Sequence, residues 1–473
     1  MTDALTIHDL QRQMYLRSLH ESRVQRINEW LAHPTNMVAA WHRVQASRGA
    51  HTPGIDGETV TPSARSPRPW LTELARQLAA GTWQPTAPRW LEIPKAGGQG
   101  TRRLGIPTLR DRVVHTALKQ LLEPVLDPRF FPHSVGFRPG TSVAWVLDQA
   151  LNCLSGGTAN GPRYSSVLRL DIANCFDEID HGTLLDQLAR HVADARILDL
   201  IRMIVVASGT TVGRWWWSRT RGLLQGSALS PLLCNLYLHG LDVELVQWGT
   251  AHHEQTTHYR YADDLLVLAA DDSLAGCTWR GIGRELQQLR QRLHPTKCHQ
   301  RLASEGFEWL GVWIHPRLTA AAKRPCGFGF DVPTAKIEAI SDEIERIVAR
   351  FRRRRSLRVQ HVEACIRLLN QQMKSARQTY RLADNLANLD RSLDAVAQDQ
   401  IGRLLRATGV ARAELSRRYR IRLPGGIATW QVGSNQLVVL SSLTTDQRRP
   451  IRFNAPWLLP PPSASQKAPF RAS

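Results

Sequence analysis

The sequence predicts an α+β protein with more than one structural unit, and three observations carry this prediction. With 473 residues, the chain is longer than a single compact hydrophobic core usually allows. Apolar residues recur at helical spacing before residue 48 and again after residue 333, as amphipathic helices require. Between these segments, short apolar runs such as SSVLRLD and THYRYADDLLVLAA indicate β-strands.

The chain is strongly basic. Its 61 lysines and arginines against 41 aspartates and glutamates give a formal net charge of +20. Most of the cations are arginines, whose forked guanidinium groups suit phosphate contacts. Because a field of this sign attracts polyanions, we expect a nucleic acid as partner. The alternative is that the charge only keeps the protein in solution.

The seven cysteines are scattered and include no C-x-x-C pair, so neither a zinc site nor a disulfide framework is predicted. The N-terminus is polar and lacks the apolar core of a signal peptide. No apolar run is long enough to span a bilayer. We therefore expect a cytoplasmic protein with no membrane partner.

Local signals predict several elements along the chain. Helices are expected over residues 1–48, and WLTELARQLAAG is expected to form an amphipathic helix that Gly81 ends, since glycine favours the C-cap position. The segment WLEIPKAGGQGTRRLGIP predicts a basic β-hairpin around a glycine-rich turn. The C-terminal PPPSASQKAPFRAS has a composition typical of disorder.

Three acidic residues form the candidate catalytic set. Asp171 ends the apolar strand VLRLD, and Asp263 and Asp264 are expected to fill the turn of a hairpin. If these strands are neighbours, the carboxylates meet at one edge of the sheet. Carboxylates this close repel unless a cation neutralises them, and their oxygens suit Mg²⁺. Two such ions can activate a 3′-hydroxyl and stabilise leaving pyrophosphate. The alternative is an exposed, purely structural turn.

Between residues 35 and 315, eight motifs follow one another in an order that resembles the bacterial reverse transcriptases of the group II intron lineage. These motifs are PGIDGETV, IPKAGGQGTRRLGIPTLRDRVVHTALKQLLEPVL, FFPHSVGFRPGTS, LRLDIANCFDEIDH, GLLQGSALSPLLCNLYLHGLD, RYADDLLVLA, LHPTKCH and FEWLGVWI. The resemblance implies an RNA-directed DNA polymerase with a right-hand fold, in which fingers and a palm with an antiparallel sheet precede a helical thumb. The domain boundaries that we expect are 1–48 for an N-terminal helical extension, 49–163 for the fingers with palm contributions, 164–330 for the palm, 331–410 for the thumb and 411–473 for a C-terminal extension.

The resemblance also implies roles for residues near the carboxylates. Asp171, Asp263 and Asp264 would hold two Mg²⁺ ions, with Mn²⁺ as a substitute and the Ile172 carbonyl as an additional ligand. Phe176 falls at the position of the aromatic steric gate that excludes a ribose 2′-hydroxyl. The alternative for Phe176 is a core aromatic side chain.

The same resemblance predicts a site for the incoming dNTP. Lys95 and Arg102 would grip its triphosphate. The family usually has Arg-Pro-Leu-Gly where this chain has Arg102-Arg103-Leu104-Gly105, so either arginine could serve. The pair Gln225-Gly226 would lie under the nascent base pair. Lys297 would approach the leaving phosphates as a general acid, unless it is only a surface lysine.

Two further clusters are candidates for nucleic-acid contact. Arg352, Arg353, Arg354 and Arg355 would follow the template–primer backbone from the thumb, with a solvated helix face as the alternative. Trp215, Trp216 and Trp217 could stack on bases, but packing within a hairpin is the preferred interpretation.

The predicted function is therefore that of a reverse transcriptase acting on dNTPs, an RNA template and a DNA or RNA primer. We expect the template to be a specific non-coding RNA and leave a homo-oligomer open. Because no nuclease motif follows the thumb, a stand-alone enzyme in anti-phage defence is the favoured role. The alternatives are a nuclease-free group II intron maturase, a CRISPR-associated reverse transcriptase, a template-independent terminal nucleotidyl transferase and a non-catalytic RNA binder.

Overall fold

The computed structural model describes residues 5–47, 49–60, 69–94, 101–158, 161–207, 220–319, 322–354, 356–424 and 426–443. Four predictions concern residues outside these ranges. They are the roles of Lys95 and Arg355, the tryptophans Trp215 to Trp217, and the disorder expected of the C-terminal tail.

A four-stranded antiparallel sheet lies at the centre of the fold, with the strand order β6-β7-β5-β8. Its strands are β5 (Ser166–Asp171), β6 (Thr256–Tyr261), β7 (Asp264–Ala269) and β8 (His299–Leu302). The segments VLRLD and YADDLLVLAA thus form neighbouring strands, β5 and β7. This confirms the strands that their apolar runs predicted.

The two faces of this sheet belong to different hydrophobic cores. Leu168 and Leu170 of β5 point into one core, whereas Val167 points into the other, together with Leu266 of β7. This is the alternation that a strand buried on both faces requires. Alternate residues along β5 and β7 therefore face alternate cores.

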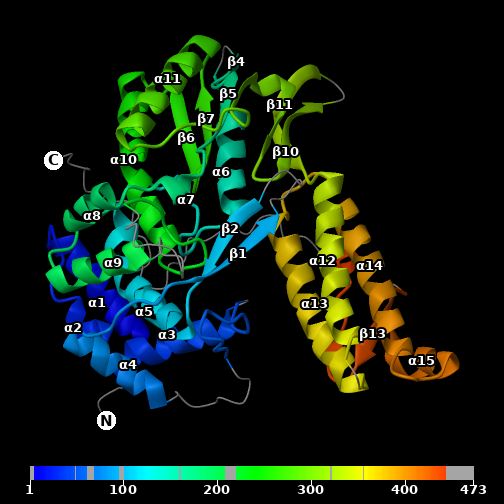
Figure 1. The fold of residues 1–473 in the computed structure, drawn as a ribbon. Helices are drawn as coiled ribbons and strands as arrows, with labels where there is room; N and C mark the ends of the chain where they lie inside the picture. Colours follow the sequence, from blue (N-terminus) through cyan, green and yellow to red (C-terminus); the bar gives the residue numbers. More distant parts are fainter. Residues whose placement is uncertain are drawn as a thin grey trace.

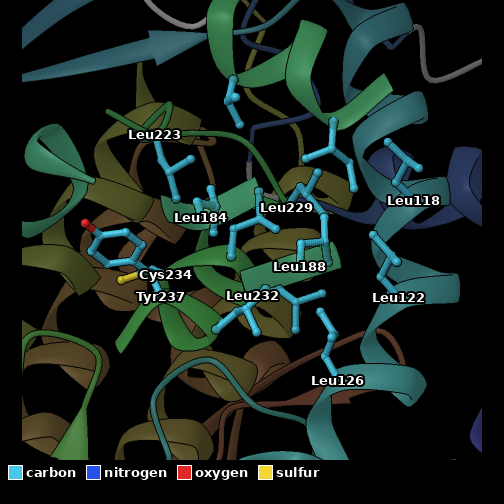
Figure 2. Close-up of a cluster of buried hydrophobic side chains, with 14 of the residues drawn as sticks. Leu118, Leu122, Leu126, Leu184, Leu188, Leu223, Leu229, Leu232, Cys234 and Tyr237 are labelled. Carbon is cyan, nitrogen blue, oxygen red and sulfur yellow. The ribbon is translucent and has the colours of Figure 1, made fainter. Parts of the chain in front are cut away.

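Helices fill the first core, and leucines supply much of its contact surface (Figure 2). They are α1 (Ile7–His20), α2 (Asn28–Leu31), α3 (Pro34–Ala46), α4 (Pro69–Ala80), α5 (Leu109–Leu126), α7 (Cys175–Glu178), α8 (His181–Ala189), α9 (Ala195–Ala207), α10 (Ser230–Ala251) and α11 (Asp272–Gln288). α4 ends as predicted, with Gly81 at a φ of 72°. No helix within the described ranges combines the length and apolarity needed to cross a membrane.

The N-terminal helices are part of this first core. Leu31, Met37 and Trp41 are buried in the same cluster as Leu118 of α5. Gln11 of α1 also donates a hydrogen bond to the Gln120 carbonyl, at 3.1 Å. Residues 7–46 are therefore anchored on the helix that follows the basic hairpin.

The basic β-hairpin forms where it was predicted. It consists of β1 (Arg89–Pro94) and β2 (Thr101–Ile106), paired in register from Arg89↔Ile106 to Pro94↔Thr101. In Figure 1 the hairpin extends from the helical half of the molecule toward the long helices that follow residue 333. Its base lies beside the loop that precedes α10, because the Gly105 N–H donates to the Gln225 carbonyl at 3.0 Å.

The second core joins the central sheet to the thumb. It contains α6 (Val143–Ser155), a sheet of order β11-β10-β9, and a bundle of three long helices. These elements are β9 (Phe307–Trp309), β10 (Val312–Thr319), β11 (Ala322–Asp331), α12 (Thr334–Arg352), α13 (Val359–Thr379) and α14 (Leu386–Arg406). Figure 1 shows the bundle standing to one side of the sheet.

Residues 411–443 pack onto the thumb bundle. Helix α15 (Arg412–Tyr419) leads into a small sheet of β12 (Arg420–Arg422), β13 (Ala428–Val432) and β14 (Asn435–Gln436). Trp430 of β13 is buried against α14 and donates its indole N–H to the Gln398 carbonyl at 2.9 Å. The beginning of the predicted C-terminal extension is thus integrated with the thumb.

Candidate active site

Asp171 and Asp264 lie directly opposite each other on β5 and β7. The Ile172 N–H donates to the Asp263 carbonyl at 3.1 Å, which makes Asp171 and Asp264 a non-hydrogen-bonded pair. In such pairs the Cα atoms are about 4.5 Å apart and the side chains share one face. Both carboxylates therefore project on the face that carries Val167 and Leu266, at the end of the strand pair.

Asp263 lies in the tight turn that joins β6 to β7. Tyr261 pairs with Asp264, so the loop contains only Ala262 and Asp263. Ala262 has a φ of 59°, which is uncommon for a residue other than glycine. The sequence suggested that both aspartates fill the turn, but Asp264 is already the first residue of β7 because it completes the ladder with Tyr261.

The LHPTKCH segment surrounds Asp171. The His294 N–H donates to the Asp171 carbonyl at 2.7 Å, and the Asp171 N–H donates to Cys298 Sγ at 3.4 Å. Lys297 Nζ lies 3.3 Å from Asp171 Oδ2. Lys297 is therefore at the acidic cluster, where its ammonium group neutralises the first aspartate.

Burial and mutual repulsion make the two hairpin aspartates hard to ionise. Burial, with the nearby Asp171 charge, raises the pKa of Asp263 above its ordinary value. Burial also raises the pKa of Asp264 to about 7, although the Arg169 charge opposes this shift. Trp309 of β9 donates its indole N–H to Asp264 Oδ1 at 3.1 Å. The positive charges of the protein are therefore not enough to keep the pKa values of Asp263 and Asp264 at their ordinary level.

The acidic set fits a divalent cation in its chemistry and backbone placement. Two half-buried carboxyl groups with raised pKa values and a third beside them offer the hard oxygen ligands that Mg²⁺ prefers. Their side chains are turned to protein partners, Asp171 to Lys297 and Asp264 to Trp309. Within the described ranges, no three His, Cys, Asp or Glu side chains converge on one point as metal ligands.

The Gln225-Gly226 loop is locked against the basic hairpin. Gly226 has a φ of 128°, and a Cβ atom there would lie 2.4 Å from the Gly105 carbonyl oxygen. A Cβ atom on Gly105 would in turn lie 2.0 Å from Leu224 Cδ1. Gly226 is thus required because its neighbour is backbone, whereas a side chain at Gly105 would have to displace the Leu224 side chain.

Phe176 follows Asp171 in the chain and contacts the segment that leads into this loop. Its ring is partly buried against the first core, and its carbonyl accepts from the Leu223 N–H at 2.7 Å. The next residue, Asp177, accepts a hydrogen bond from Gln225 Nε2 at 3.4 Å. The segment after Asp171 is therefore joined to the Gln-Gly loop, as a shared nucleotide pocket would require.

Comparison with known proteins agrees with this arrangement. The family described as "Reverse transcriptase (RNA-dependent DNA polymerase)" matches residues 93–314, which include β2, the acidic cluster and β9. Protein YkfC of Escherichia coli K12 is 32% identical over 321 residues, which make up 61% of this chain and 82% of YkfC. The chain belongs to the reverse transcriptase family. It is accordingly an RNA-directed DNA polymerase with the predicted right-hand fold, and enzymes of this class bind an RNA template and a primer and use divalent metal ions.

Other relatives of this reverse transcriptase are encoded in introns. The group II intron-encoded protein LtrA of Lactococcus lactis is 31% identical over 223 residues, 47% of this chain and 35% of LtrA. A putative COX1/OXI3 intron 1 protein of Saccharomyces cerevisiae is 27% identical over 206 residues, 44% of this chain and 23% of that protein. The chain thus spans about a third or less of these two relatives. A Candida tropicalis telomerase structure covers 77% of the chain, and the chain covers 68% of it, at a TM-score of 0.42 and 13% identity.

The two hairpin arginines of the reverse transcriptase have different surroundings. Arg103 Cζ lies 4.8 Å from the centre of the Trp90 ring, a cation–π distance. Arg102 is exposed and pairs across the hairpin with Ile93. Since neighbouring residues on a strand point to opposite faces, the two guanidinium groups lie on opposite sides of the hairpin.

The thumb arginines of the reverse transcriptase lie at the end of α12. Arg352 is the last residue of the helix, and Arg353 follows as its C-cap. Both are exposed, as is Arg354, whose Cζ lies 5.2 Å from the centre of the Phe351 ring. The structure does not bring these arginines to the acidic cluster.

Sequence reasoning missed several residues around the candidate site. Trp309 contacts Asp264, and Arg260 beside the turn is completely buried with Asp242. Arg169 and Arg301, with Trp313, line a hollow of about 130 Å³ on the face that carries Asp171. For Arg169, Asp242, Arg260, Trp309 and Trp313 the available signal was their place inside the quoted motifs. Arg301 lies outside these motifs, on the strand next to that of Asp171.

Proposed function

We propose that this reverse transcriptase synthesises DNA on an RNA template with Asp171, Asp263 and Asp264 as ligands of two Mg²⁺ ions, for which Mn²⁺ can substitute. The observation that carries this proposal is the cross-strand pairing of Asp171 with Asp264 next to the turn that holds Asp263. Bound ions would supply charge neutralisation for the attacking hydroxyl and the leaving pyrophosphate. The Ile172 carbonyl, next to this pair, is a candidate additional ligand.

The remaining residues of the site select and orient the dNTP. Phe176 would exclude a 2′-hydroxyl, and Gln225-Gly226 would support the nascent base pair. Lys297 is close enough to the acidic cluster, 3.3 Å from Asp171, to exchange that ion pair for contact with the leaving phosphates once cations neutralise Asp171. Lys95 would contribute a second positive charge from the hairpin.

A hollow beside the acidic cluster supports a path for the primer strand, although one of its cations, Arg169, is paired with Glu308 at 3.9 Å. Arg169 precedes Asp171 by two residues on β5, and His299 and Arg301 are its neighbours on β8. Trp313 lines the same hollow. Cationic and aromatic side chains on one face suit a phosphate backbone and an adjacent base. The thumb arginines Arg352 to Arg354, with Arg355, would extend this contact along the duplex.

Product sequencing tests the proposed function. Purified protein with an RNA template, an annealed DNA primer, dNTPs and Mg²⁺ is expected to yield DNA complementary to the template. A chelator should stop synthesis, and Mn²⁺ should restore it. Products that are homopolymers independent of the template would instead identify a terminal nucleotidyl transferase. Retention of RNA without any product under all these conditions would identify a non-catalytic binder.

The two hairpin arginines are expected to differ in their effect on dNTP binding. Arg103 is held on Trp90, so we assign the triphosphate contact to Arg102. Arg102→Ala should raise the KM for dNTP by about tenfold, the equivalent of one lost charge-assisted hydrogen bond. Arg103→Ala, the matched control on the opposite face, should change it by less than about threefold. Steady-state kinetics on a fixed primer–template measure both, and a reversed order would move the assignment to Arg103.

The biological role follows from the RNA that the enzyme recognises. We propose a specific structured RNA as template, with anti-phage defence as the role that the sequence favours. Relatives named as intron-encoded proteins, and a nuclear intron maturase of Arabidopsis thaliana that is 32% identical over 95 residues, favour intron maturation as the second candidate. Sequencing of RNA and attached DNA that co-purify with the protein separates the two. An intron would support maturation, and an unrelated small RNA with attached cDNA would support a stand-alone role.

A further inference from the structure

A buried ion pair lies directly beneath the turn that carries Asp263. Arg260 of β6 and Asp242 of α10 both have 0% of their side chains exposed. Arg260 Nε donates to Asp242 Oδ1 at 2.8 Å, and Nη2 donates to Oδ2. Burial acts to raise the pKa of Asp242, but the Arg260 charge and hydrogen bonds hold that pKa well below its ordinary value. The pair is therefore ionised inside the protein.

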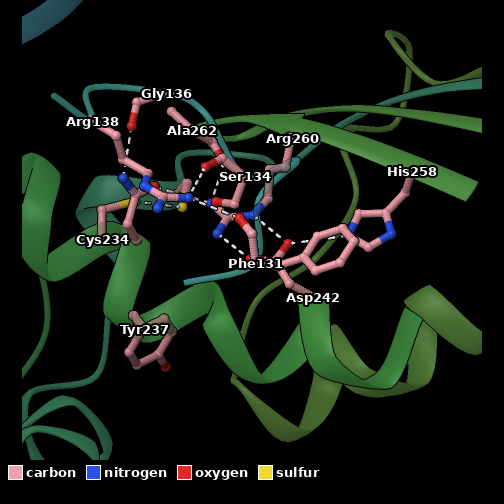
Figure 3. A network of polar contacts seen from close by, with 12 residues as sticks. Phe131, Ser134, Gly136, Arg138, Cys234, Tyr237, Asp242, His258, Arg260 and Ala262 are labelled. Carbon is pink, nitrogen blue, oxygen red and sulfur yellow. Dashed lines mark hydrogen bonds and ion pairs between the residues drawn. The ribbon is translucent and has the colours of Figure 1, made fainter. Parts of the chain in front are cut away.

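The third nitrogen of this guanidinium group contacts the turn itself. Arg260 Nη1 donates to the Ala262 carbonyl at 3.0 Å, as Figure 3 shows. That carbonyl belongs to the peptide group that joins Ala262 to Asp263. Its orientation therefore determines where the backbone of Asp263 lies.

A second contact holds the preceding peptide, which joins Tyr261 to Ala262. A Cβ atom on Gly136 would lie 2.4 Å from the Ala262 nitrogen and 3.0 Å from the Tyr261 carbonyl carbon, so the two chain segments touch through their backbones. Asn235 connects Arg260 with Gly136. Its Oδ1 accepts from Arg260 Nη1 at 3.2 Å, and its Nδ2 donates to the Gly136 carbonyl at 2.7 Å.

Stability alone is a weak account of this arrangement. Well-packed apolar residues often stabilise a core as well as a buried ion pair does. An apolar residue, however, could not donate to Asn235 and to the turn carbonyl at once. What the guanidinium group adds is a fixed set of donors aimed at an Ala262 whose φ of 59° is unusual.

We propose that Arg260, oriented by Asp242, is a positioning residue that works with Asn235 and Gly136 to fix the two peptides on either side of Ala262, so that Asp263 can join Asp171 in binding metal. This inference rests on the proposed function of Asp263. It assigns Arg260 no contact with substrate. Arg260 would affect metal binding only by holding the turn in position.

The test removes both charges together, because a single substitution would leave one buried charge unpaired. The double variant Arg260→Met with Asp242→Leu is expected to weaken Mn²⁺ binding by the free protein about 10- to 100-fold, the usual cost of losing residues that orient metal ligands. Electron paramagnetic resonance measures this affinity without any turnover. On a primer–template, kcat should fall and the KM for primer–template should not change.

A matched control separates positioning from general stability. Arg377 of α13 and Asp390 of α14 form another largely buried ion pair, at 2.8 Å, inside the thumb. Arg377→Met with Asp390→Leu should alter the thermal unfolding temperature and leave Mn²⁺ affinity as in the unmodified protein. Arg260→Lys keeps the positive charge but loses the forked guanidinium donors. Compared with the unmodified protein, it should therefore lose less thermal stability than Mn²⁺ affinity.

The outcomes decide between distinct failures. A folded Arg260/Asp242 double variant with unaltered Mn²⁺ affinity and kcat would overturn the positioning role. If that variant does not fold, Asn235→Ala leaves the ion pair intact and takes its place, with a smaller loss expected in both measurements and unaltered values refuting the proposal. Asp263→Asn with unaltered Mn²⁺ affinity and synthesis would refute the proposed function instead.

Discussion

Asp263→Asn is expected to reduce dNTP incorporation by more than about 100-fold, a larger loss than removal of a ligand-supporting residue causes. Asparagine keeps the size of the side chain and removes the charge that would hold a divalent cation. Since Asp263 lies in a two-residue turn next to the cross-strand pair of Asp171 and Asp264, the substitution leaves the sheet unchanged. RNA binding should therefore persist. Single-turnover incorporation and filter binding measure the two properties separately.

Asp199→Asn provides the control for Asp263→Asn. Asp199 is an exposed aspartate that forms an ion pair with Arg202 on the same helix, α9. Exposed pairs of this kind contribute little to stability, so incorporation should match that of the unmodified enzyme. Normal incorporation by Asp263→Asn would remove this residue from the catalytic set.

Gly226→Ala is expected to lower templated synthesis by about 100-fold, the loss that a displacement of about 1 Å at a reacting centre can cause. The new Cβ atom would lie 2.4 Å from the Gly105 carbonyl oxygen, and the φ of 128° disfavours any L side chain. The loop or the hairpin must move, and Gln225 moves with the loop. The rate of the first templated addition measures the effect.

The matched control is another glycine-to-alanine change in the helix that follows. A Cβ atom on Gly240 of α10 meets nothing within 4 Å, and alanine is favoured over glycine inside a helix. Gly240→Ala should therefore retain full synthesis and at least equal thermal stability. Equal activities for Gly226→Ala and Gly240→Ala would show that the hairpin–loop contact does not set the geometry of the site.

Local sequence signals were sufficient to predict those elements whose structure depends mainly on residues close together in the chain. The hairpin of β1 and β2, the end of α4 at Gly81, and the strands around the acidic turn all follow from periodicity and turn residues. The motif order supplied the family and the right-hand fold. These features need no knowledge of which distant segments meet.

Contacts between distant segments could not be predicted in the same way. Lys297 pairs with Asp171 across 126 residues, and Trp309 reaches Asp264 from another sheet. In the sequence Arg260 is like any other charged strand residue, because its partner Asp242 lies on a different element, α10. A single sequence shows the residue types but not the partners, because the energy of a buried charge depends on what surrounds it.

The strands β5 and β7 separate the two hydrophobic cores and contribute side chains to both. Leu168 and Leu265 belong to the first core, and Val167 and Leu266 belong to the second. Removing either half of the protein would expose one side of these strands to water, at a cost of about 25 cal/mol for each Å² of apolar surface. The part of the protein on either side of β5 and β7 therefore cannot be replaced by itself, because the replacement would also have to repack the strands that carry Asp171 and Asp264.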